Sequence, residues 1–191
     1  EFHLMDGKTK EVDMMFQEGH VQYAADTNLD CQVVGLPFAD NRFVMSVILP
    51  NKKCSLPDLE KKLTGKLLED LIFSTAPMTV KLSLPKFKVE SSLDLNDAMR
   101  SLGASDIFDK GLADLSGITK SEKLFVSKAV HKAFLSVDEH GAEAAAATGI
   151  MIEPMCLIIA ELEMEVNHPF LVAIHDQNSK KVAFFGRVLN P

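Results

Sequence analysis

The sequence predicts an α+β fold in which strands predominate over short helices. Two β-rich apolar runs, Val33–Phe38 and Phe43–Leu49, flank the turn-forming residues 39–42 and predict a buried hairpin. Residues 78–85 alternate apolar and polar side chains, with the apolar ones at 78, 80, 82 and 84, as in a strand with one buried face. The 191 residues are enough for one domain with its own core.

Local patterns predict the other elements of the first two thirds. His20–Ala25 is expected to be a third strand near the hairpin. Ser55 and Thr64 each precede apolar residues at helical spacing, so each is expected to cap a short helix. Asp94 is expected to cap a third helix, and Gly103 is placed to end it.

Three extended segments are expected near the end of the chain. The segment Leu124–Val137 is long and rich in Phe and Val. Two final strands, Phe170–His175 and Val182–Val188, flank a turn at residues 176–180.

Composition excludes several partners. The net charge is −7, from 27 acidic and 20 basic residues, and the basic residues are scattered, so nucleic acid is not expected to bind. No apolar run approaches the roughly 20 residues of a membrane-spanning helix, so no membrane partner is expected. The first residues show no signal peptide.

Motifs for catalysis and metal binding are missing. The sequence has no nucleophile elbow, Gly-rich phosphate loop or HExxH motif, so we expect neither an enzyme nor a cofactor. The spacing of Cys31, Cys54 and Cys156 fits neither a disulfide framework nor a zinc site. Each is expected to be a free thiol that is buried or half-buried. The histidines have no metal-binding spacing.

The alanine-rich segment 141–149 fits two different structures. The high helix propensity of alanine favours a short helix between Gly141 and Gly149. Such a helix would be only about two turns long, shorter than the roughly 12 residues that an isolated helix needs. In an extended conformation, one face carries only small side chains that could slide between two existing strands while Glu143 points outward. These small residues are Ala142, Ala144, Ala146 and Thr148.

Several motifs resemble the serpin family. Residues 128–148, KAVHKAFLSVDEHGAEAAAAT, are similar to the strand and hinge that precede the reactive loop of inhibitory serpins. Residues 167–174, NHPFLVAI, resemble the family signature, and residues 184–191, FFGRVLNP, resemble its C-terminus. Leu84–Phe87 and Asp114–Gly117 fit internal landmarks in the same order. The chain therefore resembles the C-terminal half of a serpin.

The resemblance implies a partial serpin domain over residues 1–191. Residues 1–138 would form central strands and helices, 139–160 the hinge and reactive-centre loop, and 161–191 the C-terminal strands. The N-terminal half of the domain would be absent and would itself be a partner of this chain. The family resemblance also favours a secreted, extracellular protein over a cytoplasmic one.

The resemblance also implies a function and its residues. A serine protease would be trapped as an acyl-enzyme when the cut loop inserts into the main sheet. The scissile bond would join Met155 to Cys156, with Cys156–Leu157 as a second candidate, and the apolar Met155 favours a chymotrypsin-like or elastase-like protease. The hinge would comprise Glu139, Gly141, Ala142, Glu143, Ala144, Ala145, Ala146, Ala147 and Thr148. The hinge departs from the family in Ala142, where Thr or Ser is commoner.

Two further residues are assigned by the resemblance. Lys86 and Glu139 would form an ion pair where the loop enters the sheet, and His131 would be a buried histidine below the insertion site, with partners in the absent half. Two alternatives stay open. The protein could be a non-inhibitory serpin-fold carrier or chaperone-like protein, or the chain as given could be an inactive fragment.

Overall fold

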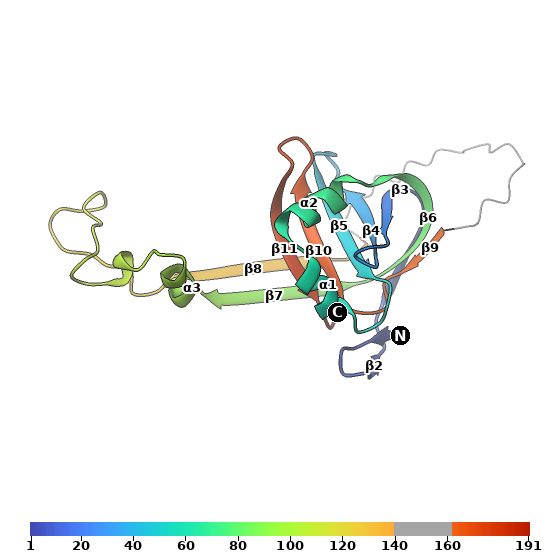
Figure 1. The fold of residues 1–191 in the computed structure, drawn as a ribbon, viewed down its shortest axis with the longest axis horizontal. Helices are drawn as coiled ribbons and strands as arrows, with labels where there is room; N and C mark the ends of the chain where they lie inside the picture. Colours follow the sequence, from blue (N-terminus) through green and yellow to red (C-terminus); the bar gives the residue numbers. More distant parts are fainter. Residues whose placement is uncertain (140–161) are drawn as a thin grey trace, which may run out of the picture. The chain divides into compact units, whose positions relative to one another are not determined.

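The computed structural model describes residues 1–139 and 162–191, which divide into two compact units (Figure 1). The first unit joins Glu1–Phe87 to Ser136–Pro191, and the second unit is Lys88–Leu135. Strands predominate and the helices are short, so the predicted α+β class is confirmed. Within the described ranges, no helix has both the length and the apolar character needed to cross a membrane.

The first unit is built on a seven-stranded sheet with the order β11-β10-β5-β4-β3-β6-β9. The strands are β3 (Met14–Asp26), β4 (Cys31–Pro37), β5 (Phe43–Pro50), β6 (Ala76–Pro85), β9 (Leu162–Glu165), β10 (Phe170–Asp176) and β11 (Lys181–Val188). Neighbouring strands are antiparallel except β6 and β9, which run parallel. A separate ladder pairs β1 (Phe2–His3) with β2 (Thr9–Lys10).

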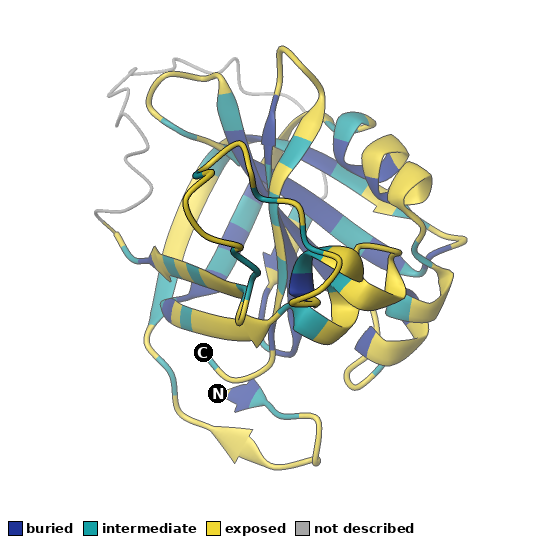
Figure 2. Cartoon of the chain, turned by 90° about the vertical axis from the view of Figure 1, so that its left-hand side faces the viewer, coloured by how far each residue is buried: buried dark blue, intermediate teal, exposed yellow. Residues whose placement is uncertain are grey.

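The centre of the sheet confirms the predicted hairpin. Strands β4 and β5 are antiparallel, with Val34 opposite Val47, and β10 adds Val172 on the other side of Val47. All three valines are fully buried. A strand that is covered on both faces needs a continuous apolar run, which explains why the sequence signal is strongest here. Buried residues (dark blue in Figure 2) concentrate in these strands.

Two helices contribute to the same core. Leu56 and Leu59 of α1 (Leu56–Lys62) and Ile72 of α2 (Gly65–Phe73) belong to a buried cluster with residues of β4 and β5. The predicted cap of α2 is confirmed, because Thr64 Oγ1 accepts a hydrogen bond from Leu67 N at 3.2 Å. Ser55 occupies the cap position of α1, but its hydroxyl donates to Lys52 O at 2.6 Å, so the predicted side-chain cap is wrong.

Strand β3 is longer than the predicted His20–Ala25, because ten of its residues pair with β6. The alternation predicted for β6 holds for Val80, Leu82 and Leu84, which are buried. It is wrong for Met78, which is 43% exposed although it lies on the same face. The buried face of β6 therefore begins at Val80.

The second unit holds most of a two-stranded sheet of β7 (Phe87–Asp94) and β8 (Val130–Val137), and the whole of a short helix α3 (Asn96–Ser101). Strand β8 is shorter than the extended segment predicted from Leu124, and β7 was not predicted at all. The end of α3 at Gly103 is confirmed by its φ of +94°, a conformation that favours glycine. A 3₁₀ turn η1 (Asp106–Phe108) follows α3.

Asp94 lies one residue before the cap position of α3 and not, as predicted, at that position. Its Oδ1 accepts a hydrogen bond from Asn96 N at 3.0 Å, while Leu95 occupies the cap position. No residue of α3 is buried, and Leu102, which follows its last residue, is 87% exposed.

The cysteines confirm one expectation and correct another. Cys31 is a buried free thiol, and burial raises its pKa to about 12, so it stays protonated at neutral pH. Cys54 is a free thiol but is exposed rather than buried or half-buried, because it lies in the loop between β5 and α1. Cys156 lies outside the described residues.

A charged contact fixes the end of β10 to the start of β5. Arg42 donates to Asp176 Oδ2 from Nη2 at 2.9 Å and from Nε at 3.2 Å, and Asn178 N donates to Asp176 Oδ1 at 2.9 Å. The hydrogen bonds from Arg42, which are the largest cause, lower the pKa of Asp176 to about 2 from 3.8. The carboxylate therefore stabilises the folded chain in its ionised form.

This contact predicts that the folded state loses stability in acid. The folded state holds Asp176 ionised at pH values where the unfolded state binds a proton, so its contribution is present above about pH 4 and is lost as pH falls toward about 2. Asp176→Asn removes this contribution. We expect the urea midpoint of the wild type to fall more than that of Asp176→Asn across this window. Asp97→Asn, at an exposed position on α3, is the control. Its urea midpoint should change with pH as that of the wild type does.

Candidate functional site

The predicted reactive loop falls almost entirely on residues outside the described ranges. The hinge residues Gly141–Thr148 and the candidate scissile residues Met155, Cys156 and Leu157 lie within 140–161. The structure describes the two points where the chain enters and leaves this segment. These are Glu139, just after β8, and Leu162, the first residue of β9.

The entry point is held by the pair assigned from the resemblance. Lys86 Nζ lies 2.8 Å from Glu139 Oε1. The hydrogen bond between the two side chains raises the pKa of Lys86 and lowers the pKa of Glu139, so both charged forms are favoured. Both side chains are partly exposed, and such surface pairs orient groups more than they stabilise a fold.

The backbone around Lys86 explains how this side chain is positioned. Lys86 N donates to Asp13 O at 2.8 Å, which ties the junction of β6 and β7 to the segment before β3. The next residue, Phe87, packs edge-on against Phe170 with ring centroids 5.4 Å apart. Lys86 therefore projects from a short stretch that is fixed on both sides.

An apolar groove lies beneath the entry point. It has a volume of about 220 Å³, and its apolar wall includes Leu36, Leu82, Leu84 and Val137. Glu139 and Asp138 form part of its polar rim. The chain thus approaches residue 140 along an apolar floor with a charged edge.

The exit point is attached to β6, the strand that ends one residue before Lys86. In β9, Leu162 lies opposite Val80 and Glu165 lies opposite Ser83 of β6. Val166 N extends this contact by donating to Ser83 O at 2.8 Å. Entry at Lys86 and exit at Val80 therefore lie near opposite ends of the apolar part of β6.

Strand β9 was not predicted, although a weak signal was present. Leu162, Met164 and Val166 alternate with glutamates, and Met164 and Val166 are buried. Four residues with two glutamates have low β-propensity and pair only because the edge of β6 is open to them.

His131 differs from the expectation taken from the resemblance. It lies in β8 and is exposed in this chain rather than buried. The resemblance implies partners for His131 outside this chain, and that part of the expectation stays a prediction.

Two histidines that received no role have structural contacts. The buried His168 has Nε2 2.7 Å from Pro50 O and Nδ1 2.9 Å from Asn167 Oδ1, and it joins the start of β10 to the end of β5. His175 is fully buried with Nε2 3.0 Å from Ser46 Oγ, and desolvation lowers its pKa. Among the described residues, no group of His, Cys, Asp and Glu side chains could hold a metal ion.

Comparison with known proteins gives the family of this chain. The profile of the family described as Serpin (serine protease inhibitor) matches residues 1–191. Serpin A3-3 of Bos taurus is 43% identical over 192 residues, covering 100% of this chain and 45% of that protein. Leukocyte elastase inhibitor A of Mus musculus is 38% identical over 200 residues, covering 100% of this chain and 52% of that protein.

A solved structure agrees with the sequence relatives. The complex of thyroxine-binding globulin with thyroxine superposes with a TM-score of 0.82 at 26% identity, covering 100% of this chain and 49% of that chain. The chain spans about half the length of the curated relatives it matches. The family profile, the curated relatives and the fold agree, and the chain belongs to the serpin family.

Proposed function

We propose that the protein carrying this chain inhibits a serine protease by offering residues 140–161 as bait. The observation that carries the proposal is the attachment of this segment at both ends to β6 and its extension, through Leu162 and through the Lys86–Glu139 pair. The family description and a relative named as an elastase inhibitor support it. A bait held at both ends keeps its two anchors in place when a protease approaches.

Until the loop is cut, the protease carries out every step of the proposed reaction. The protease serine attacks the carbonyl carbon of Met155, the peptide bond breaks, and the amino group of Cys156 leaves with a proton. Met155 remains esterified to the serine. Insertion of the small-residue face of the hinge as a new strand then separates the ester from the groups that would hydrolyse it.

The composition of the hinge supports insertion over simple cleavage. Ala142, Ala144, Ala146 and Thr148 share one face of an extended chain, and burying them leaves no unpaired charge. A protease with an apolar specificity pocket suits Met155. An elastase-like or chymotrypsin-like enzyme is therefore the proposed target.

A carrier function is the second candidate. The fold is shared with a solved complex of thyroxine-binding globulin and thyroxine, in which the protein binds a small molecule. A carrier needs no inserting hinge, so the two functions differ in what happens after the loop is cut.

The test mixes the longest natural form of the protein with an elastase, with chymotrypsin and with trypsin. We expect a complex with the first or second enzyme that survives denaturing electrophoresis, because an ester joins the two chains. Met155→Arg should move complex formation toward trypsin, whose pocket prefers a basic side chain. Cleavage without a stable complex for all three enzymes would contradict inhibition and favour the carrier function.

A further inference from the structure

The seven-stranded sheet contains a buried polar pair, Ser46 of β5 and His175 of β10. Both residues are 0% exposed, and His175 Nε2 lies 3.0 Å from Ser46 Oγ. The sheet order begins β11-β10-β5, so β11 is an edge strand and the β10–β5 ladder joins the β10–β11 hairpin to the rest of the sheet (Figure 1). The pair therefore lies on the contact that holds this hairpin in place.

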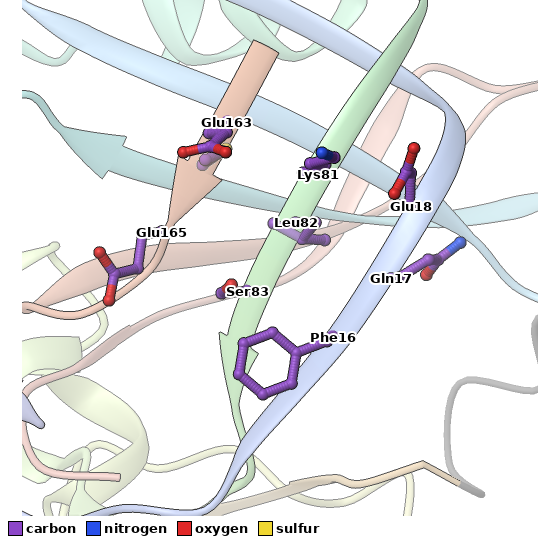
Figure 3. A pocket seen from close by; sticks show the side chains of 9 residues that line it. Phe16, Gln17, Glu18, Lys81, Leu82, Ser83, Glu163 and Glu165 are labelled. Carbon is purple, nitrogen blue, oxygen red and sulfur yellow. The ribbon is translucent and has the colours of Figure 1, made fainter. Parts of the chain in front are cut away.

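The strands that carry the pair are covered on both faces. On β6, by contrast, Leu82 is buried while its neighbours Lys81 and Ser83 are half-buried and line the groove drawn in Figure 3. On β5, residues 44–50 are all buried without alternation. Water therefore does not reach His175 from either face of the sheet.

His175 has one hydrogen-bond partner for its two ring nitrogens. In ranges 1–139 and 162–191, its Nδ1 is buried and has no partner. Phe73 of α2 packs edge-on against the imidazole, with ring centroids 4.8 Å apart. A neutral imidazole carries one N–H donor, whereas the protonated ring carries two. Protonation of His175 would thus bury both a charge and an unpaired N–H group.

The nearest carboxylate in the sequence does not compensate this charge. Asp176 follows His175 directly, but its Oδ2 accepts from Arg42 Nη2 at 2.9 Å and its Oδ1 accepts from Asn178 N at 2.9 Å. Successive residues of a strand also point to opposite faces. Asp176 is therefore already paired, on the other side of β10.

The helix and the strand on the other sides of His175 offer no buried carboxylate either. Lys180 places its Nζ 5.8 Å from the centroid of the Phe73 ring, and a cation there disfavours a second one nearby. Desolvation lowers the pKa of His175 below its usual 6.5. The remaining charged residues of α2 and β11 are exposed, and they are Lys66, Glu69, Asp70, Lys181 and Arg187.

A second buried histidine has the opposite arrangement. His168, just before β10, has Pro50 O 2.7 Å from Nε2 and Asn167 Oδ1 2.9 Å from Nδ1. Both N–H groups of its protonated ring would find an acceptor. Desolvation lowers the pKa of His168 too, but the hydrogen bond with Pro50 O opposes this effect. Of these two histidines, only His175 would be left with an unpaired donor.

We propose that the Ser46–His175 pair is an acid-sensitive switch, which holds the β10–β11 hairpin on β5 at neutral pH and releases it when His175 is protonated. Histidine is suited to this role because its charge changes close to physiological pH. Release needs only the β10–β5 ladder to open, since β11 is at the edge of the sheet. The inference goes beyond the proposed function and does not depend on it.

The direction of the pH effect follows from the two states of the hairpin. With the hairpin released, His175 is hydrated and binds a proton near pH 6.5, whereas in the closed sheet it does so only at lower pH. The closed state is therefore fully favoured above about pH 6.5 and loses this advantage as pH falls below it. This window lies above that of Asp176, which begins near pH 4.

The test measures hydrogen exchange of the β10 and β11 backbone amides in the longest natural form of the protein. After correction for intrinsic exchange rates, we expect the opening constant of the wild type to rise by up to about tenfold between about pH 7.5 and about pH 5.5. His175→Gln keeps an amide donor for Ser46 Oγ but cannot titrate, so it should lose this rise. Ser46→Ala combined with His175→Leu removes both polar groups and should lose it as well.

His20→Gln, at an exposed position on β3, is the matched control and should keep the wild-type rise. An equal rise in the wild type and in both His175 variants would overturn the proposal, because other groups would then cause it. A rise spread evenly over all strands of the sheet would contradict release of the hairpin. No rise in the wild type would also overturn the proposal, since a group outside this chain would then accept from Nδ1.

Discussion

Ala146→Arg is expected to convert the proposed inhibitor into a substrate. In the proposed inserted state, the side chain at 146 faces the interior of a sheet, where an arginine would be buried without a partner. An unpaired buried charge costs several kcal/mol, and each 1.4 kcal/mol corresponds to about tenfold in an equilibrium. The yield of denaturant-stable complex with the target protease should therefore fall by at least about tenfold, while loop cleavage rises.

Ala145→Arg is the matched control for this change. It adds the same side chain one position away, on the opposite face of an extended chain, where solvent can hydrate it. It should form the stable complex as the wild type does. Thermal melting adds a second readout, since cutting the loop should raise the melting temperature of the wild type and of Ala145→Arg but not of Ala146→Arg. Full trapping by Ala146→Arg would contradict insertion of this face.

Phe170→Ala is expected to cause the largest loss of folding stability. Phe170 is fully buried, lies opposite Val188 of β11 and packs edge-on against Phe87 with ring centroids 5.4 Å apart. Removing a buried phenyl ring leaves a cavity and costs about 3–5 kcal/mol of the free energy of unfolding. This would lower the melting temperature by about 6–20 °C for a chain of this size.

Urea unfolding checks the prediction, with Phe185→Ala as the control. Phe185 lies on the neighbouring strand β11 but is 48% exposed, so its loss should change the free energy of unfolding much less. A change below about 1 kcal/mol for Phe170→Ala would contradict the packing described for β10.

The elements that local sequence predicted well are those whose signal is complete within a few residues. The hairpin of β4 and β5 has two apolar runs and a turn between them. The cap at Thr64 and the helix end at Gly103 each depend on one side chain and its own backbone. The cap and the helix end are both confirmed. Local sequence could predict them, because neither needs a distant residue.

The elements that were missed depend on distant partners. Strand β7 pairs with β8, which lies far along the chain, and most of its side chains are exposed, so no apolar run marks it. Strand β9 is four residues long and exists through its parallel contact with β6. The failed cap at Ser55 has a local cause, since its hydroxyl donates to Lys52 O.

The candidate site also has features that the sequence predicts and features that only the folded chain shows. The small-residue face of 141–148 and the family motifs can be recognised in the amino-acid order, and the scissile bond inferred from them stays a prediction. The contact of Lys86 with Glu139 and the place of Leu162 beside Val80 appear only in the folded chain.

Periodicity and turn residues are properties of neighbours in the chain, and they suffice to locate apolar strands and helix ends. Which strand lies beside which, and whether a given face is covered, depends on contacts between residues far apart in sequence. Met78 and Val80 illustrate the difference, since both fit one alternating pattern but only Val80 is buried. Burial is set by what the rest of the fold places against each face.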